Sequence, residues 1–155
     1  MKGIFIILTS TIFSTFALAQ NCDYKSFSQN GVTVKQFNPM PIGGDNNKQV
    51  ALSISNVNGN DNLMITIRFK GNATEINKKV KITLANKNSI NLIADRIGSD
   101  YIGGSPIKQM IFSLNSEVIN QLMENQISSL TLNTTDIISA KMFKDYIGNN
   151  LKCLN

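Results

Sequence analysis

The residues that could carry chemistry in this chain are few, and the most informative one is missing. The sequence contains no histidine, the side chain that most often acts as a general acid or base near neutral pH. Its absence excludes Ser-His-Asp and Cys-His catalysis and the usual catalytic zinc sites. A phosphate-binding loop is also missing, because Gly103-Gly104-Ser105 runs into Pro106 where a helix should begin. The sequence therefore predicts no catalytic residue, no metal ligand and no cofactor, and argues against an enzyme.

Carboxylates are the remaining acid/base groups. Asp95 and Asp100 flank a short segment that ends in Tyr101, and two such acids could in principle form a hydrolytic pair. We favour turn-forming acids beside a loop, and we take Asp95, Asp100 and Tyr101 as a candidate binding loop. Two Asn-rich loops, 43–47 and 56–62, could offer oxygens to Ca²⁺, but neither matches a known calcium loop and turn chemistry explains both.

Two cysteines, Cys22 and Cys153, stand near the two ends of the chain. A redox pair would favour a close C-x-x-C spacing, and a zinc site would need more ligands. In an oxidising compartment an isolated pair of cysteines usually forms a disulfide. We therefore predict a structural disulfide between Cys22 and Cys153, which requires the two ends of the domain to lie together.

The first residues have the pattern of a secretory signal peptide. Met1-Lys2 supplies a positive charge, Gly3–Phe16 is uncharged and mainly apolar, and Ala17-Leu18-Ala19 offers small residues for cleavage. An uncleaved anchor and a lipoprotein are the alternatives, and Gln20 and Asn21 fit poorly before a lipidated Cys22. We predict a signal peptide over 1–19, cleavage between Ala19 and Gln20, and a protein that is secreted or periplasmic and has no membrane attachment after cleavage.

Composition indicates one domain with no nucleic-acid partner. Residues 20–155 have the length of one ordinary domain with its own core. The chain has 15 Lys and Arg against 10 Asp and Glu, spread along its length, and no Trp. The one cluster, Lys78-Lys79 and Lys81, alternates with apolar residues and reads as a solvated face of a strand, with an anion contact as the alternative.

Hydrophobic residues alternate with polar ones over most of the chain, which is typical of strands with one buried face. The clearest case is 63–70, where Leu63, Ile65, Ile67 and Phe69 alternate with polar or outward residues. An Asn58-Gly59 pair predicts a hairpin before it. We expect about seven or eight antiparallel strands.

The last third adds helical periodicity. Asn115 should cap a helix that starts at Ser116, a strand should follow near 130–132, and a second short helix should occupy 140–147 and end at Gly148. The expected fold is mainly β, with α+β character at the C-terminal end: an antiparallel β-sandwich or curled sheet with two short helices. The order strand, short helix, strand between Ile107 and Asn133 resembles many small, uncharacterised secreted bacterial β-rich proteins, a resemblance of patterning that implies no active site.

Three classes of function remain at this point. We expect a secreted or periplasmic non-catalytic module that binds a protein or an envelope surface ligand through loops or a sheet face. The alternatives are a secreted inhibitor or toxin-like factor, and a carboxylate-dependent hydrolase. The sequence does not indicate the oligomeric state or the identity of the partner.

Overall fold

The computed structural model describes residues 22–132 and 136–154. The predicted signal peptide, its Ala19–Gln20 cleavage site and most of the polar stretch after Leu132 lie outside these residues. Most of the described chain folds into strands of two antiparallel sheets. The larger sheet, called here the large sheet, contains β1 (Tyr24–Gln29), β2 (Val32–Phe37), β3 (Met40–Gly44), β4 (Lys48–Val57), β5 (Asn60–Phe69), β8 (Arg96–Ile102) and β9 (Ser105–Ser113). The small sheet contains β6 (Lys79–Leu84), β7 (Ser89–Ile93), β10 (Ile127–Leu132) and β11 (Asp136–Ser139).

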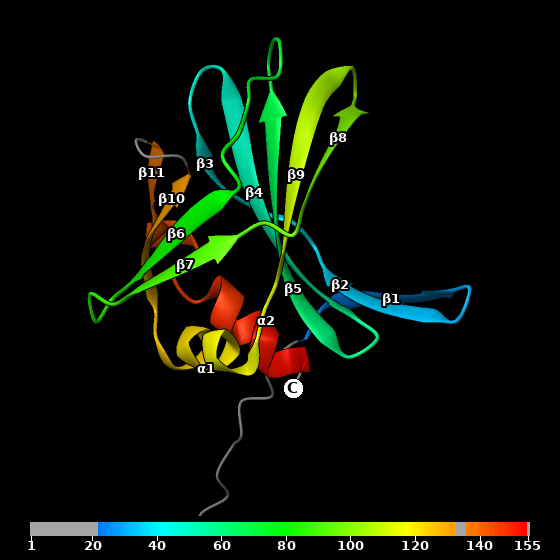
Figure 1. Cartoon of the computed structure of the whole chain (residues 1–155), viewed down its shortest axis with the longest axis vertical. Helices are drawn as coiled ribbons and strands as arrows, with labels where there is room; N and C mark the ends of the chain where they lie inside the picture. The colour runs from blue at the N-terminus through cyan, green and yellow to red at the C-terminus, as the bar shows by residue number, and fades with distance from the viewer. Residues whose placement is uncertain (1–21, 133–135, 155) are drawn as a thin grey trace, which may run out of the picture.

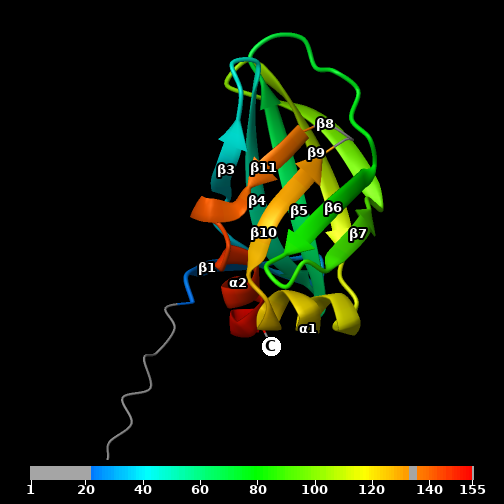
Figure 2. The ribbon, with the colours of Figure 1, turned by 90° about the vertical axis from the view of Figure 1, so that its left-hand side faces the viewer.

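The strand order makes an open, two-layered arrangement. The large sheet has the order β1-β2-β4-β5-β9-β8, and β3 pairs with the same edge of β4 as β2 does. The small sheet has the order β11-β10-β6-β7, and it lies against one face of the large sheet (Figures 1 and 2). The expected mainly antiparallel β fold with two short helices is confirmed, with more strands than the seven or eight expected.

The core lies between the two sheets. The inner face of β5 contributes Leu63, Ile65 and Ile67, each at most 3% exposed, while Val80 and Ile82 of β6 face them from the small sheet. Burying each of these side chains stabilises the fold by about 1.5–3 kcal/mol. The Asn58-Gly59 turn joins β4 to β5 with both residues at positive φ, as the hairpin prediction requires.

Two helices close the end of the sandwich where β5 begins (Figure 1). The first, α1 (Ser116–Glu124), is capped as predicted: the Asn115 side-chain oxygen accepts a hydrogen bond from the Val118 amide at 2.9 Å. The second, α2 (Tyr146–Leu154), begins six residues later than expected, after a single 3-10 turn at Ala140–Met142. The carbonyl of Lys144 accepts from the amide of Ile127 in β10, so this segment is bonded to the small sheet before the helix begins.

The prediction that Gly148 ends the second helix is wrong, because Gly148 lies in the first turn of α2. A Cβ placed on Gly148 would collide with the backbone carbonyl of Leu122 in α1. Glycine is therefore present to let the two helices approach each other, a packing requirement that in sequence has the same pattern as a helix stop.

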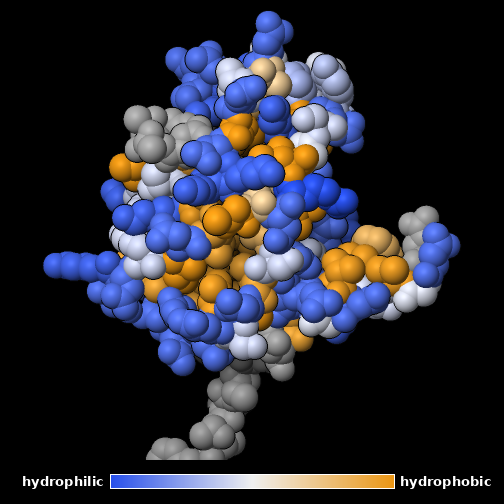
Figure 3. All heavy atoms as spheres, in the orientation of Figure 1, coloured by the Kyte–Doolittle hydropathy of each residue, from blue (hydrophilic) through white to orange (hydrophobic). Residues whose placement is uncertain are grey.

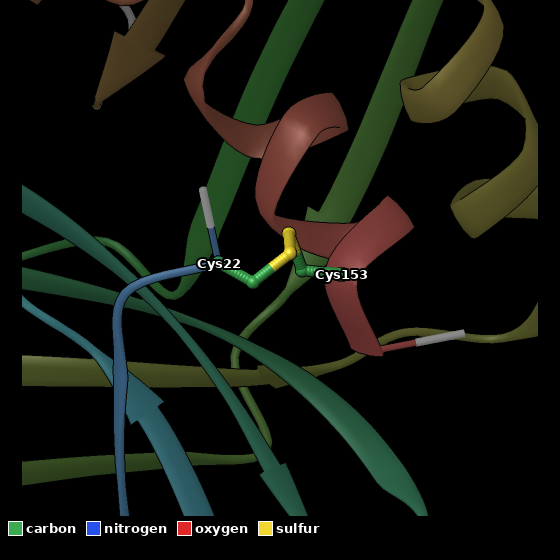
Figure 4. Close-up of a disulfide and its surroundings, with 2 residues drawn as sticks. All are labelled: Cys22 and Cys153. Carbon is green, nitrogen blue, oxygen red and sulfur yellow. A yellow bond between two sulfur atoms is a disulfide. The ribbon is translucent and has the colours of Figure 1, made fainter. Parts of the chain in front are cut away.

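The predicted disulfide is confirmed. Cys22 and Cys153 are bonded, with their Cα atoms 5.7 Å apart, and they are 131 positions apart in sequence. The bond joins the segment before β1 to the last turn of α2 (Figure 4). The described chain therefore begins and ends at one place, and the bond is typical of a protein that works in a non-reducing compartment.

Candidate binding face

The face of the large sheet that points away from the small sheet is called here the outer face, and it carries a groove of about 620 Å³. Adjacent strands supply its floor in register: Ala51 of β4 pairs with Thr66 of β5, which pairs with Gln109 of β9. Met64 and Ile107 extend this floor on either side. The groove therefore depends on strands that are distant in sequence and come together only in the sheet.

One wall of the groove is formed where β2 passes into β3. Both strands pair with the same edge of β4, so the chain bends between them at Asn38-Pro39. Pro39 and Pro41 line the groove from this bend. The hairpin that follows requires Gly44, whose φ is +147° and whose Cβ position is occupied by the Lys48 backbone.

The opposite wall comes from the β8–β9 hairpin. Ile102, the last residue of β8, is 51% exposed and lines the groove beside the buried Ile107. Arg68 of β5 lies against the turn of this hairpin, since a Cβ on Gly103 would come within 3.5 Å of a guanidinium nitrogen. A mainly apolar floor, with Thr66 and Gln109 as its polar members, is therefore bordered by one strongly basic side chain.

The groove has an uneven charge distribution. Arg68 is the one charged residue among the described residues that line it, and Gln36, Gln49 and Gln109 add neutral amides. A guanidinium offers several donors to a carboxylate or phosphate and never loses its charge in proteins. The arrangement suits a ligand with an apolar part and an anionic group, with amides available for a polar backbone.

The three residues of the predicted binding loop do not form one loop, because Asp95 precedes β8 while Asp100 and Tyr101 lie within this strand. The Asp95 carboxylate accepts a hydrogen bond from the Ser113 amide at 2.6 Å, and the Asp100 carboxylate accepts from the Tyr101 amide at 2.8 Å. Asp95 directly precedes β8 and Asp100 is its fifth residue, so five residues of extended chain place the two acids about 17 Å apart. They do not converge on one position, and Tyr101 is 71% exposed next to the groove-lining Ile102.

The groove residues themselves carry no sequence motif. Met64 and Arg68 stand at the outward positions of the strand with the clearest alternation, where Met is unusual for a solvated surface. That Met, together with the two prolines in 39–41, is the one signal that could have pointed to this face.

A second groove, of about 630 Å³, lies on the solvent face of the small sheet. Lys79 and Lys81 line it between the exposed side chains of Ile93 and Ile137. The lysines alternate with the buried Val80 and Ile82, as expected for a solvated strand face. This groove differs from that of the outer face in carrying two lysines and no arginine among the described residues that line it.

The Asn-rich loops use their polar groups within the turns. Asp45 accepts hydrogen bonds from the amides of Asn47 and Lys48 at 2.7 and 2.9 Å. The hydrogen bond from Asn47 is the main cause that holds the pKa of the Asp45 carboxyl below its ordinary value. In the second loop, Asn56 accepts from the Gly59 amide and donates to the carboxylate of the buried Asp61. Both loops thus have the turn chemistry expected of them.

Within residues 22–132 and 136–154, no three Cys, Asp or Glu side chains gather in a way that could hold a metal ion. Neither helix of this part of the chain has the length and hydrophobicity needed to span a membrane. Comparison of the chain with protein-family models, with curated proteins and with solved structures finds no match.

Proposed function

We propose that this protein is an exported, non-catalytic binding module that holds a segment of a partner protein in the groove of the outer face. The single observation that supports this is the groove itself, with an apolar floor of Met64, Ala51 and Ile107 and one guanidinium at its border. Concave, mainly apolar sites with a few placed polar groups are the usual form of a ligand site.

The chemistry of the groove favours an acidic, partly apolar segment. An apolar side chain of the ligand would fill the floor, and a carboxylate would bind Arg68 through charge-assisted hydrogen bonds. The amides of Gln49 and Gln109 could then bond to the peptide backbone. Asp100 lies across β9 from Arg68, with Ile107 between them, so the acidic group should approach Arg68 from the side of β4.

The arrangement of acids supports a binding role over hydrolysis. A carboxylate pair needs two acids on either side of one bond, within about 10 Å of each other. Asp95 and Asp100 are farther apart along one strand, and each already accepts a backbone hydrogen bond. With no histidine in the chain and no carboxylate among the described residues that line the groove, the groove offers hydrogen-bonding groups and no pair of acids.

The test is capture of partners from the native envelope and extracellular fractions by four forms of the protein. Thr66→Arg places a large cation on the groove floor, and Arg68→Ala removes the proposed anchor for a carboxylate. Lys81→Ala, on the small sheet, is the matched control. We expect the wild-type and Lys81→Ala proteins to retain the same partner, Arg68→Ala to bind it at least about tenfold more weakly, and Thr66→Arg to lose it.

Equal capture by all four forms would show that binding occurs elsewhere on the molecule. Absence of any partner, together with hydrolysis of envelope polymers by the purified protein, would replace the binding proposal with the hydrolase. Circular dichroism of each variant verifies that the substitutions leave the fold intact.

A second candidate function is a secreted inhibitor or toxin-like factor, and the β1–β2 hairpin favours it. This hairpin projects from the body of the molecule, and hydrophobic atoms cover the side seen in Figure 3. Phe27 and Val32 are 50% and 37% exposed. If the hairpin inserts into a cleft of a target, Phe27→Ser should abolish the interaction while Thr66→Arg leaves it unchanged.

A further inference from the structure

The strand β8 is a free edge of the large sheet. It pairs with β9 on one side and ends the strand order on the other. Six of its seven residues are exposed, and it contains neither proline nor lysine, the residues that commonly protect a sheet edge from other strands. Such an edge presents backbone groups that another strand can bind.

The pairing of β9 identifies which of these backbone groups are free. The Leu114 amide donates to the carbonyl of Asp61 in β5, in register with the β5–β9 pairing. Because backbone groups alternate in direction along a strand, the odd-numbered residues of β9 must point toward β8. Their partners are Arg96, Gly98 and Asp100, so the amides and carbonyls of Ile97 and Ser99 point away from the sheet.

The free stretch has definite limits. Before it, the Asp95 amide donates to the carbonyl of Ile111 in β9. After it, the Tyr101 amide is already bound by the carboxylate of Asp100. The open edge is therefore Arg96–Asp100, with Gly98 at its centre.

Charge is distributed symmetrically about that centre. Arg96 and Asp100 are each two residues from Gly98. All three lie on the outer face, because their partners in β9 do: Arg96 pairs with Ile111, Gly98 with Gln109 and Asp100 with Ile107. In an antiparallel pair of two identical strands centred on Gly98, Arg96 of each copy stands opposite Asp100 of the other. Oppositely charged residues that face each other across antiparallel strands stabilise the pairing.

We propose that a second copy of this chain binds along β8 in this register, about a two-fold axis that passes between the two Gly98 residues, and joins the two large sheets into one. The amide of Ile97 then donates to the carbonyl of Ser99 in the other copy, and the carbonyl of Ile97 accepts from the amide of that Ser99. The two-fold axis repeats both bonds with the copies exchanged. The glycines face each other at the axis, where neither offers a side chain, and space beside Gly98 is open. Shifting the pairing register by two residues would lose both charge pairs. Shifting it by one would place the free amides and carbonyls of one copy opposite residues whose backbone groups point the other way.

The test is sedimentation velocity over a wide range of protein concentration. Arg96→Glu would place like charges opposite each other at two symmetry-related positions, and we expect the dissociation constant of the dimer to rise at least about tenfold. The double exchange Arg96→Asp with Asp100→Arg restores opposite charges and should restore the wild-type constant. Lys81→Glu makes the same charge change on the small sheet and should leave it unchanged.

Ser99→Pro tests the backbone bonds independently of charge. The Ser99 amide points outward, so proline removes a donor needed by the second copy and leaves the β8–β9 bonds in place; this variant should be monomeric. A wild-type protein that stays monomeric at every concentration would overturn the proposal, and so would a dimer that Arg96→Glu and Ser99→Pro both leave intact. If Ser99→Pro fails to fold, the charge-exchange series alone decides. The edge borders the groove, since Gly98 and Asp100 pair with Gln109 and Ile107 of its floor. Sedimentation of the purified protein involves no ligand, so its result does not depend on the proposed function.

Discussion

At the scale of single residues, Tyr146 links the helical end to the sheet. Its hydroxyl donates a hydrogen bond to the carbonyl of Asn38 at 2.7 Å, across 108 residues of sequence. Asn38 lies at the bend between β2 and β3 that leads into a wall of the groove. Burial raises the pKa of Tyr146 to about 12, because the neutral hydroxyl is favoured where water is partly excluded.

Replacing Tyr146 with Phe should destabilise the protein by about 1 kcal/mol at neutral pH, since one hydrogen bond is lost. Folding raises the pKa of Tyr146, so its hydroxyl ionises at lower pH in the unfolded chain than in the folded protein. The stability that this residue contributes is therefore fully present below about pH 10 and is lost as the pH rises toward about 12. The wild type should therefore lose stability more steeply than Tyr146→Phe between pH 10 and 12.

Urea denaturation at a series of pH values measures this difference. The matched control is Tyr101→Phe, which removes a hydroxyl that is largely exposed. Parallel pH dependences for the wild type and Tyr146→Phe would contradict the role assigned to this residue.

Residues with local roles could be predicted, and residues of the outer face could not. Asn115 as a cap and Asn58-Gly59 as a turn act through their own backbone neighbourhood, so their effect can be read from a few adjacent residues. Arg68 acts through its position next to Ile107, which is set by strand pairing. A lone Arg on an alternating strand carries no mark that separates a groove residue from a solvated one.

At the scale of secondary-structure elements, the contact between α1 and α2 depends on one glycine. The Gly148 backbone lies against the Leu122 carbonyl, and a side chain has no space there. Leu122 and Leu151 are buried within the core beside this contact. Helix pairs that approach closely need a small residue at the crossing.

Gly148→Ala should therefore lower the free energy of unfolding by about 1–3 kcal/mol, as overpacking a well-packed core does. Helix propensity alone predicts the opposite, a gain of up to about 1 kcal/mol, so the sign separates the two effects. Thermal denaturation followed by circular dichroism measures it, with Lys152→Ala on the exposed side of the same helix as the control. A higher melting temperature for Gly148→Ala would show that the helices can separate at no cost.

The strands β1 and β8 could not be predicted from the sequence, and the physical reason is the same for both. Alternation of apolar and polar residues appears only where one face of a strand is buried. Nearly all of β8 is exposed, and β1 contains Lys25, Ser26 and Ser28, so neither shows the period of two. The sequence therefore does not predict either strand, and Asp100 and Tyr101 of the candidate binding loop lie on β8.

At the scale of the whole molecule, the disulfide closes nearly the entire described chain into one ring. Linking residues separated by 131 positions restricts the unfolded chain by an amount that chain-entropy arguments put at about 5 kcal/mol. The double variant Cys22→Ser, Cys153→Ser should therefore melt at least about 10 °C lower than the wild type. Reduction of the wild type should reproduce the same loss.

Differential scanning calorimetry of the oxidised, reduced and double-variant proteins tests this. An unchanged melting temperature would mean that packing of α2 on the core holds the two ends together without the bond. The pairing of the cysteines could be predicted because the chain has two of them. The strand order could not, since β5 pairs with β9 across the whole small-sheet hairpin β6–β7, and no local pattern specifies such a partner.

The disulfide between Cys22 and α2 also determines which end of the molecule an attached domain or tether would leave from. Both cysteines lie at the helical pole, whereas the β3–β4 and β8–β9 turns, which border the groove, lie at the opposite pole (Figure 1). An additional domain or a tether attached before Cys22 or after Cys153 would leave from beside α2. Either attachment would leave the two turns that border the groove at the end of the molecule away from the point of attachment.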